Sequence, residues 1–200
     1  MDNFANFING LCYICLKREE VICNKCFSRL IAFRNEDPNE ISIYRYNEVA
    51  SKILLMSKYP PYNFYILKHL IRRTTLDFRY PQNTLLCPIP ISSLKMFERK
   101  FNQADLISTE FSKKLNINSQ EIIKRVADTK PLFSMGRKAR IKELTGIFKP
   151  KLLSKFLINK FPNIVLVDDL RTTGETLLQA RRVLIQLGYK SVSYLTLFGT

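Results

Sequence analysis

The clearest change in the hydrophobic pattern lies near the C-terminus, where an apolar run gives way abruptly to polar residues. Ile164–Val167 is apolar at every position, which is typical of a strand covered on both faces, as in a parallel sheet between layers of helices. After the polar residues, apolar positions recur at a helical period, at Leu177, Ala180, Leu184 and Leu187. Gly188 suits the end of that helix, so the pattern predicts a strand, a short loop and a helix.

The rest of the chain shows the same alternation of strand and helix patterns. Further strands are predicted at Ile41–Tyr44, Thr84–Pro90, around Ile122–Val126 and at Ser191–Phe198. Helices are predicted at Glu48–Lys58, at Tyr62–Arg73 and after Asn102, a suitable N-cap. Residues 128–146 are too weakly patterned for a helix or strand, as in a functional lid or a disordered insert. This alternation predicts an α/β fold with a parallel sheet flanked by helices.

Four of the five cysteines form two close pairs near the N-terminus, Cys12, Cys15, Cys23 and Cys26. Two C-x2-C knuckles supply the closed set of four thiolates that structural zinc prefers, here in a small knuckle or ribbon. Disulfides and a redox pair are the alternatives. Residues 1–11 lack the basic start and long apolar stretch of a secretion signal, so a reduced compartment and Zn²⁺ are favoured. Cys87 lies in an apolar stretch and is predicted to be an inert buried thiol.

The amino-acid composition shows a large excess of basic over acidic residues. The formal net charge is +15, and from Lys124 to Lys160 there are eleven Lys or Arg and only two acids. This excess favours attraction to polyanions, and a basic groove with aromatic residues is typical of surfaces that hold single-stranded nucleic acid. Candidate stacking rings are Phe97, Phe101, Phe133 and Phe148, and a plain core position is the alternative for each of them. A general lysine bias of the organism is the plainer alternative. No apolar run is long enough to make a transmembrane segment.

Two adjacent carboxylates, Asp168 and Asp169, follow the apolar strand. Ligands of parallel sheets bind beyond the carboxyl ends of strands, where such acids can accept hydrogen bonds from sugar hydroxyls, directly or through Mg²⁺. The loop Thr172–Thr176 offers backbone N–H groups, Gly174 leaves room for a phosphate, and the following helix N-terminus favours an anion. An acidic strand end followed by a plain helix cap is the alternative. A P-loop is excluded, because the chain contains no Gly-Lys pair.

This region resembles the 5-phosphoribosyl-1-pyrophosphate (PRPP) signature of type I phosphoribosyltransferases, in which an apolar run and an Asp-Asp pair precede a Thr-Gly-x-Thr loop. The resemblance implies that Asp168 and Asp169 hold the ribose hydroxyls, with Mg²⁺ bound alongside PRPP. It also implies that the loop holds the 5-phosphate. The loop residues concerned are Leu170, Arg171, Thr172, Thr173, Gly174, Glu175 and Thr176.

A second block, Pro88–Ile91 followed by Arg99–Ala104, resembles the P-x-P … R-G-F-N-Q-A block of the ComF (ComFC) competence proteins, a DNA-uptake branch of the phosphoribosyltransferase fold. Tyr46, the Lys58-Tyr59 pair and several residues between positions 128 and 148 match the same family in order, and the four-cysteine module is typical of it. The resemblance covers nearly the whole chain. It implies a zinc-binding module at 1–38 and a phosphoribosyltransferase-like domain at 39–200.

Three positions depart from the family pattern. Lys100 stands in place of its usual glycine, Glu143 in place of its usual asparagine, and the usual glutamine near Leu132 is missing. By analogy, the segment after the Thr84–Pro90 strand borders the pyrophosphate. The candidates there are Ile89, Pro90, Lys95, Arg99 and Lys100. Basic candidates for a lid over the ligand, or for contact with DNA, are Lys124, Arg125, Arg137, Lys138 and Arg140.

The resemblance implies a cytoplasmic protein of natural transformation that binds single-stranded DNA and uses a PRPP-type pocket for a phosphoribosyl ligand or for the DNA backbone. A helicase or the DNA-uptake machinery at the inner face of the cytoplasmic membrane is a further expected partner. The alternative is an active phosphoribosyltransferase that joins PRPP to a base or amine, although no base-specificity pocket is recognisable and the catalytic residues stay unassigned. A PRPP-sensing regulator is disfavoured, because no helix-turn-helix pattern is visible.

Overall fold

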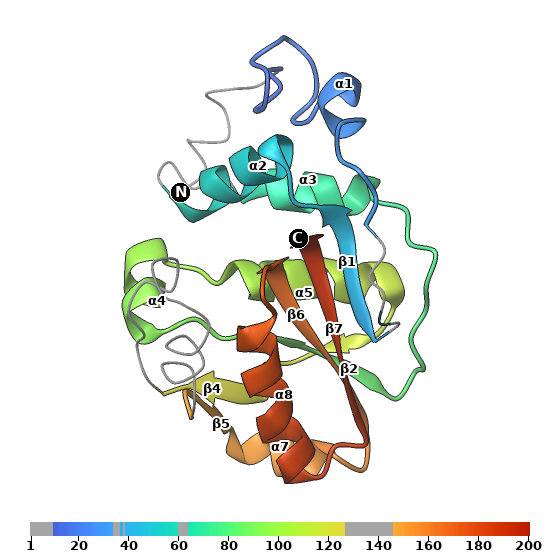
Figure 1. The fold of residues 1–200 in the computed structure, drawn as a ribbon, viewed down its shortest axis with the longest axis vertical. Coiled ribbons are helices and arrows are strands. Elements are labelled where there is room, and N and C mark those ends of the chain that lie inside the picture. Colours follow the sequence, from blue (N-terminus) through green and yellow to red (C-terminus); the bar gives the residue numbers. More distant parts are fainter. Residues whose placement is uncertain (1–9, 34–36, 38, 60–63, 127–145) are drawn as a thin grey trace.

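The computed structural model describes residues 10–33, 37, 39–59, 64–126 and 146–200. It contains a five-stranded sheet of order β1-β7-β6-β2-β3, in which every neighbouring pair is parallel. The strands are β1 (Glu40–Arg45), β2 (Thr84–Pro88), β3 (Asn118–Ser119), β6 (Asn163–Arg171) and β7 (Ser191–Gly199). Helices flank this sheet (Figure 1), so the predicted α/β class is confirmed.

The two faces of the sheet are covered by different helices. α2 (Glu48–Lys58), α3 (Tyr65–Arg73) and α5 (Gln103–Leu115) pack on one face, and α8 (Glu175–Leu187) packs on the other. Side chains of β6 alternate between these layers: Val165 and Val167 join the first cluster, whereas Ile164 and Leu166 join the second. Burial on both faces is the physical reason that this stretch of β6 is apolar at every position.

Shorter elements complete the fold. They are α1 (Asn24–Phe27), α4 (Ser93–Arg99), α7 (Leu152–Leu157) and an antiparallel pair formed by β4 (Ile123–Arg125) and β5 (Phe148–Pro150). Ile123 and Phe148 place the β4–β5 pair in the cluster on the α8 side of the sheet. Among the helices that the structure describes, none is long and apolar enough to cross a membrane.

Most predicted elements are confirmed, and the differences involve length. α2 has the predicted bounds, and Asn102 caps α5 because its Oδ1 accepts a hydrogen bond of 3.1 Å from the N–H of Ala104. α3 is described from Tyr65, so its predicted start at Tyr62 lies outside the described residues. The pattern did not predict α1, α4, α7, β3 or β5, which are too short to show a periodicity. β6 continues to Arg171, so both acids lie within the strand rather than after it.

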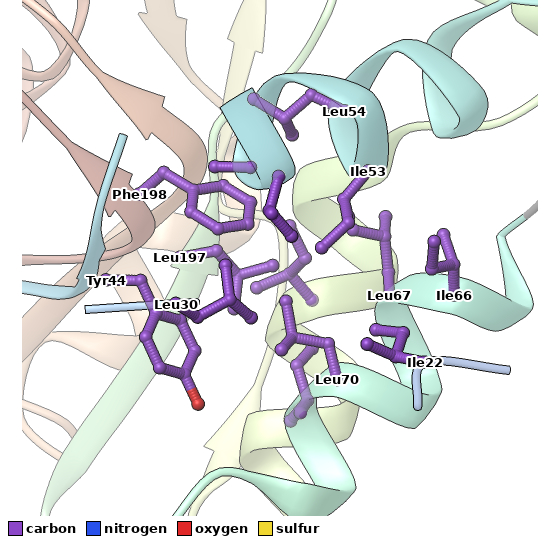
Figure 2. Packing of buried hydrophobic residues seen from close by; sticks show 14 of the residues in the cluster. Ile22, Leu30, Tyr44, Ile53, Leu54, Ile66, Leu67, Leu70, Leu197 and Phe198 are labelled. Carbon is purple, nitrogen blue, oxygen red and sulfur yellow. The ribbon is translucent and has the colours of Figure 1, made fainter. Parts of the chain in front are cut away.

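The cysteine segment packs directly on the rest of the fold. Ile22 lies beside Leu67 and Leu70 of α3 (Figure 2), and buried cysteines belong to the same apolar cluster. Arg73 of α3 donates a hydrogen bond to the carbonyl of Ile22, and its guanidinium lies 4.2 Å from the ring centroid of Phe27. The division at residue 38 stays a prediction, since the core is continuous across it.

Candidate functional site

The candidate site lies where β6 extends beyond its neighbour β2. β2 ends at Pro88, opposite Val167, and the N–H of Ile89 then donates a hydrogen bond of 2.9 Å to the carbonyl of Val167. The chain after β2 leads to α4 and α5, whereas the chain after β6 leads to α8 on the opposite face. Adjacent parallel strands whose connections diverge in this way form a crevice at their carboxyl ends, where ligands of such sheets bind.

Asp168 and Asp169 lie on this protruding end of β6, which remains paired with β7 on its other side. Successive strand residues point to opposite faces, so Asp169 follows Val165 and Val167 towards the α2 layer and Asp168 faces the α8 layer. Asp169 is buried and Asp168 is half-buried. The N–H of Asp169 donates a hydrogen bond of 2.8 Å to Oδ1 of Asp168. The two carboxyl groups therefore reach the crevice from the two sides of the sheet.

Lys58, at the C-terminal end of α2, is a site residue to which the sequence reasoning gave no role. Its Nζ lies 2.6 Å from Oδ2 of Asp169, and the two side chains are only 23% and 10% exposed. Burial acts to lower the pKa of Lys58, but the charge of Asp169, the hydrogen bond to Asp169 and the charge of Asp168 together outweigh it, and the pKa is raised. Lys58-Tyr59 was visible as a family match. A lysine at a helix end is usually exposed to solvent, so only the tertiary structure shows that Lys58 pairs with Asp169.

The proton affinity of Asp168 is shifted strongly. Burial, followed by the charge of Asp169, raises the pKa of Asp168 to about 7, although Lys58 and Arg125 act in the opposite direction. A hydroxyl group or a cation that enters the crevice therefore meets a carboxyl group whose charge changes near neutral pH. Perturbed carboxyl groups in crevices are typical of functional sites.

Three further cations share the electrostatic environment of the acids. Burial lowers the pKa of Lys95 on α4, and the charges of Arg125 on β4 and Arg99 on α4 lower it further, against the charge of Asp168. Arg99 also acts on Lys58. Two pyrophosphate-side candidates and one lid candidate therefore lie within electrostatic range of the acid pair or of Lys58.

The other candidates on that side are more dispersed. Ile89 and Pro90 are buried in the connection after β2, where Nδ2 of Asn102 donates a hydrogen bond of 2.9 Å to the carbonyl of Ile89. Lys100 lies against the ring of Phe97, and Lys124 is exposed on β4. The remaining lid candidates lie outside the described residues and stay predictions, at Arg137, Lys138 and Arg140.

The loop Thr172–Thr176 joins β6 to α8. Gly174 is the N-cap of α8, and its φ of +72° is a conformation that favours glycine. A Cβ at Gly174 would lie 3.4 Å from Nε of Arg171. That Nε is buried and has no hydrogen-bond partner in the described part of the chain, while the guanidinium pairs with Glu40 through Nη2. The loop therefore combines an open backbone with a buried, unpartnered N–H donor.

Two features limit how the loop receives an anion. The hollow lined by Asp168 and the loop residues is small, with a volume of only about 30 Å³. Oε1 of Glu175 accepts a hydrogen bond of 2.8 Å from Gln179 on α8, so this acid is engaged along the helix. A phosphate would require the loop to open further.

The four N-terminal cysteines form a compact cluster. Their Sγ atoms all lie within 4.8 Å of one another, and those of Cys15 and Cys23 are 3.8 Å apart. Four sulfurs at about 2.3 Å from a tetrahedral ion lie about 3.8 Å apart, so the cluster fits such an ion. Burial and the neighbouring thiols raise the pKa of Cys26, whereas backbone hydrogen bonds outweigh burial at Cys12 and bring its pKa to about 7. Cys87 lies outside the cluster, and burial raises its pKa to about 12.

The fold is that of an α/β phosphoribosyltransferase-like protein, because it has a parallel five-stranded sheet with flanking helices. The four-cysteine cluster at its N-terminus is of the kind that can hold a metal ion. No family model matches the chain. The chain is 30% identical to Competence protein F of Haemophilus influenzae over 206 aligned residues, which cover 92% of this chain and 88% of that protein. The chain therefore belongs to the family of Competence protein F, and the resemblance to the ComF proteins is confirmed.

The raised pKa of Asp168 predicts how its replacement changes stability. Its contribution to the free energy of unfolding is full below the unfolded pKa of about 4 and is lost as the pH rises through about 7. Asparagine cannot ionise, so Asp168→Asn removes this loss of stability at high pH. The variant should therefore be more stable than the parent by more than about 1 kcal/mol at pH 8, and the two should be equally stable at pH 4. Urea unfolding at both pH values measures the difference.

Asp169→Asn is the matched control, because it makes the same substitution one residue away and leaves Lys58 without its partner. It should lower the free energy of unfolding by roughly 1–3 kcal/mol at pH 8. Equal effects of the two substitutions at pH 8, or a stability difference for Asp168→Asn that does not change with pH, would contradict the account of the acid pair.

Proposed function

We propose that the protein acts in DNA uptake during natural transformation, in the cytoplasm, and binds single-stranded DNA together with PRPP or a related phosphoribosyl ligand. Membership of the Competence protein F family supports the role in uptake. The net charge of +15 supports attraction to a polyanion. The proposed partners in the cell are a helicase or the membrane-bound uptake machinery.

One observation carries the choice of small ligand, namely the order of three features along the crevice. The loop Thr172–Thr176 and the N-terminus of α8 favour an anion and follow the acid pair on one side. Lys95 and Arg99, on the connection after β2, share the electrostatic environment of the acids on the other side. An anion site, a hydroxyl-binding acid pair and a cation group match the phosphate, the ribose diol and the diphosphate of PRPP.

Mg²⁺ fits this crevice best when it arrives with the ligand. Asp169 is already paired with Lys58, and Asp168 has a pKa of about 7, so the empty acid pair offers a cation little uncompensated charge. Mg²⁺ in proteins is usually held by one or two carboxylates together with substrate phosphates. We therefore expect weak binding of Mg²⁺ alone and Mg²⁺-dependent binding of PRPP, with Lys58 moving off Asp169.

Calorimetry with PRPP tests this site. The parent protein should bind PRPP in the presence of Mg²⁺, and the double variant with Asp168→Asn and Asp169→Asn should show no measurable binding, because it lacks the anionic oxygens that hold Mg²⁺ and the diol. Glu19→Gln, which removes an exposed carboxylate of the cysteine segment, is the control and should bind normally. Thermal melting establishes that each variant is folded. Unchanged PRPP affinity in the folded double variant would refute the assigned pocket.

The charge excess generates a second test of the proposal. Affinity for an unstructured oligonucleotide should fall steeply with salt, with a slope in the log–log plot of about −0.7 per phosphate contacted. Fluorescence anisotropy with labelled oligo(dT) measures this slope over a series of salt concentrations. Absence of binding at low salt would end the DNA part of the proposal.

We further propose that the cysteine cluster holds a structural Zn²⁺, because four thiolates leave no open coordination position for catalysis. Purified protein should contain about one zinc per chain, and Cys12→Ser should lose the metal and melt at lower temperature, since the cluster is part of the main core. Cys87→Ala is the control that removes a thiol outside the cluster. Full metal content in Cys12→Ser would contradict the site.

The second candidate function is phosphoribosyl transfer to a base or amine. The observation that favours it is the group of cations beside the acid pair. The bond between C1 of the ribose and the pyrophosphate oxygen would break, an acceptor nitrogen would bond to C1, and Lys95 and Arg99 would stabilise the charge on the departing pyrophosphate. Release of pyrophosphate with any nucleobase or amine would establish this function. If no pyrophosphate is released with any acceptor although PRPP binds, the result would count against this function.

A further inference from the structure

A group of aromatic side chains on α3 and α4 takes no part in the crevice described above. Phe97 of α4 is 73% exposed and Tyr65 of α3 is 48% exposed. A cavity of about 860 Å³ adjoins these helices, and its lining includes Phe64, Phe101 and three lysines, Lys68, Lys100 and Lys113. We call this region the aromatic groove and define it by Phe64, Tyr65, Lys68, Phe97, Lys100 and Phe101.

The rings of the groove are arranged as platforms, each with an ammonium group beside it. Phe64 stacks on Tyr65 with centroids 4.9 Å apart and planes inclined by 24°, and it meets Phe101 edge-on at 5.8 Å. Nζ of Lys68 lies 5.5 Å from the centroid of Phe64 and 5.8 Å from that of Tyr65. On α4, Nζ of Lys100 lies 4.2 Å from the centroid of Phe97. Ring faces and phosphate-binding groups thus occur together.

The aromatic groove continues towards the crevice. A second cavity of about 580 Å³ is lined by Phe97, Pro90 and Ile91, and it shares Met96 and Lys100 with the first cavity. Pro90 and Ile91 belong to the connection after β2, the segment that borders the acid pair. An extended ligand can therefore run from α3 across α4 to the edge of the phosphoribosyl site.

The charges in the two cavities suit an anionic ligand. The described lining includes six cations, Lys68, Arg99, Lys100, Lys113, Lys124 and Arg125, and three acids, Asp105, Glu110 and Glu121. Glu110 is paired with Lys113 at 3.2 Å and with Arg72 at 3.5 Å, and Glu121 is paired with Lys151. Six cations against three acids leave the lining of the two cavities with a net positive charge.

The backbone of Lys100 gives a further indication. Its φ is +63°, a left-handed conformation that is unfavourable for a residue with a Cβ, and the ComF pattern has glycine at this position. Lysine in a strained C-cap is unfavourable for the fold, and its ammonium lies against an exposed ring. Strain of this kind is tolerated where the side chain has a function.

We propose that the aromatic groove holds single-stranded DNA, with successive bases stacked on Tyr65 and Phe97 and with phosphates beside Lys68 and Lys100. This inference rests on the proposed function, because it assigns the DNA-binding surface of a protein proposed to bind single strands. The ligand is single-stranded because the bases of a duplex are paired and stacked on one another, so their faces are not available to the rings, and stacking on rings is sequence-tolerant. A protein partner is the competing occupant and is separated by the test.

The test uses the full chain, which contains no tryptophan. Phe97→Trp places a single reporter in the aromatic groove, and its emission should be quenched when oligo(dT) is added. Phe156→Trp is the matched control, because Phe156 is 74% exposed on α7, which leads into the opposite end of β6. Its emission should be unaffected. Quenching at both positions, or at neither, would overturn the proposal.

Affinity measurements complete the test. Phe97→Ala and Tyr65→Ala should each weaken oligo(dT) binding at least about fivefold without changing the salt slope, and should leave PRPP binding unchanged. Lys68→Ala should reduce the salt slope by about 0.7. Lys100→Gly should reduce the slope likewise while raising the melting temperature, since glycine relieves the strained φ.

The outcomes separate this inference from the proposed function. If the parent protein binds no oligonucleotide, the proposed function and the groove both fail. If the parent binds with the expected salt slope and the variants with changed ring residues bind equally well, DNA contacts another surface and only the groove assignment is overturned. Loss of binding to a protein of the uptake machinery, with DNA binding intact, would identify the groove as a protein-docking surface and would also overturn it.

Discussion

The structure depends on one costly arrangement, in which two adjacent carboxyl groups on the protruding end of β6 are buried or half-buried. Asp168 and Asp169 lie at the edge of an apolar core, where packed hydrocarbon side chains would be at least as stable. Their charge is offset by Lys58 from α2 and by cations from α4 and β4, so four elements distant in sequence converge on one point. An arrangement that costs stability and is assembled from so many elements is best explained by a ligand.

The N-terminus of α5, which contains most of the Phe-Asn-Gln-Ala block, positions both walls of this crevice. Asn102 holds the carbonyl of Ile89, which belongs to the connection after β2, at 2.9 Å. Gln103 holds the carbonyl of Ser57 at 3.1 Å, next to Lys58, so two consecutive side chains fix the two segments that face the acids. Asn102 and Gln103 therefore act by positioning other residues. Neither side chain needs to touch a ligand, but loss of either would displace the residues that do.

The hydrophobic periodicity of the sequence was sufficient to predict the long helices and strands. It failed where contacts between distant parts of the chain determine the structure. Ile164–Val167 shows a doubly covered strand because both its faces are buried, and the bounds of α2 follow from a strong helical pattern. The extension of β6 through the acids was missed, because charged residues resemble a loop until β7 is known to pair with them. Lys58 was missed for a related reason: a terminal lysine carries no local sign that a carboxylate 111 positions further along the chain will meet it.

The central claim is that the acid pair and the Thr172–Thr176 loop hold the two ends of a phosphoribosyl group. A crystal structure of the protein soaked with PRPP and Mg²⁺ tests this most directly. The account predicts the diol on Asp168 and Asp169, the 5-phosphate on an opened loop, the diphosphate beside Lys95 and Arg99, and Lys58 withdrawn from Asp169. A crevice without ligand at saturating PRPP, or a ligand bound elsewhere while Lys58 and Asp169 stay paired, would contradict it.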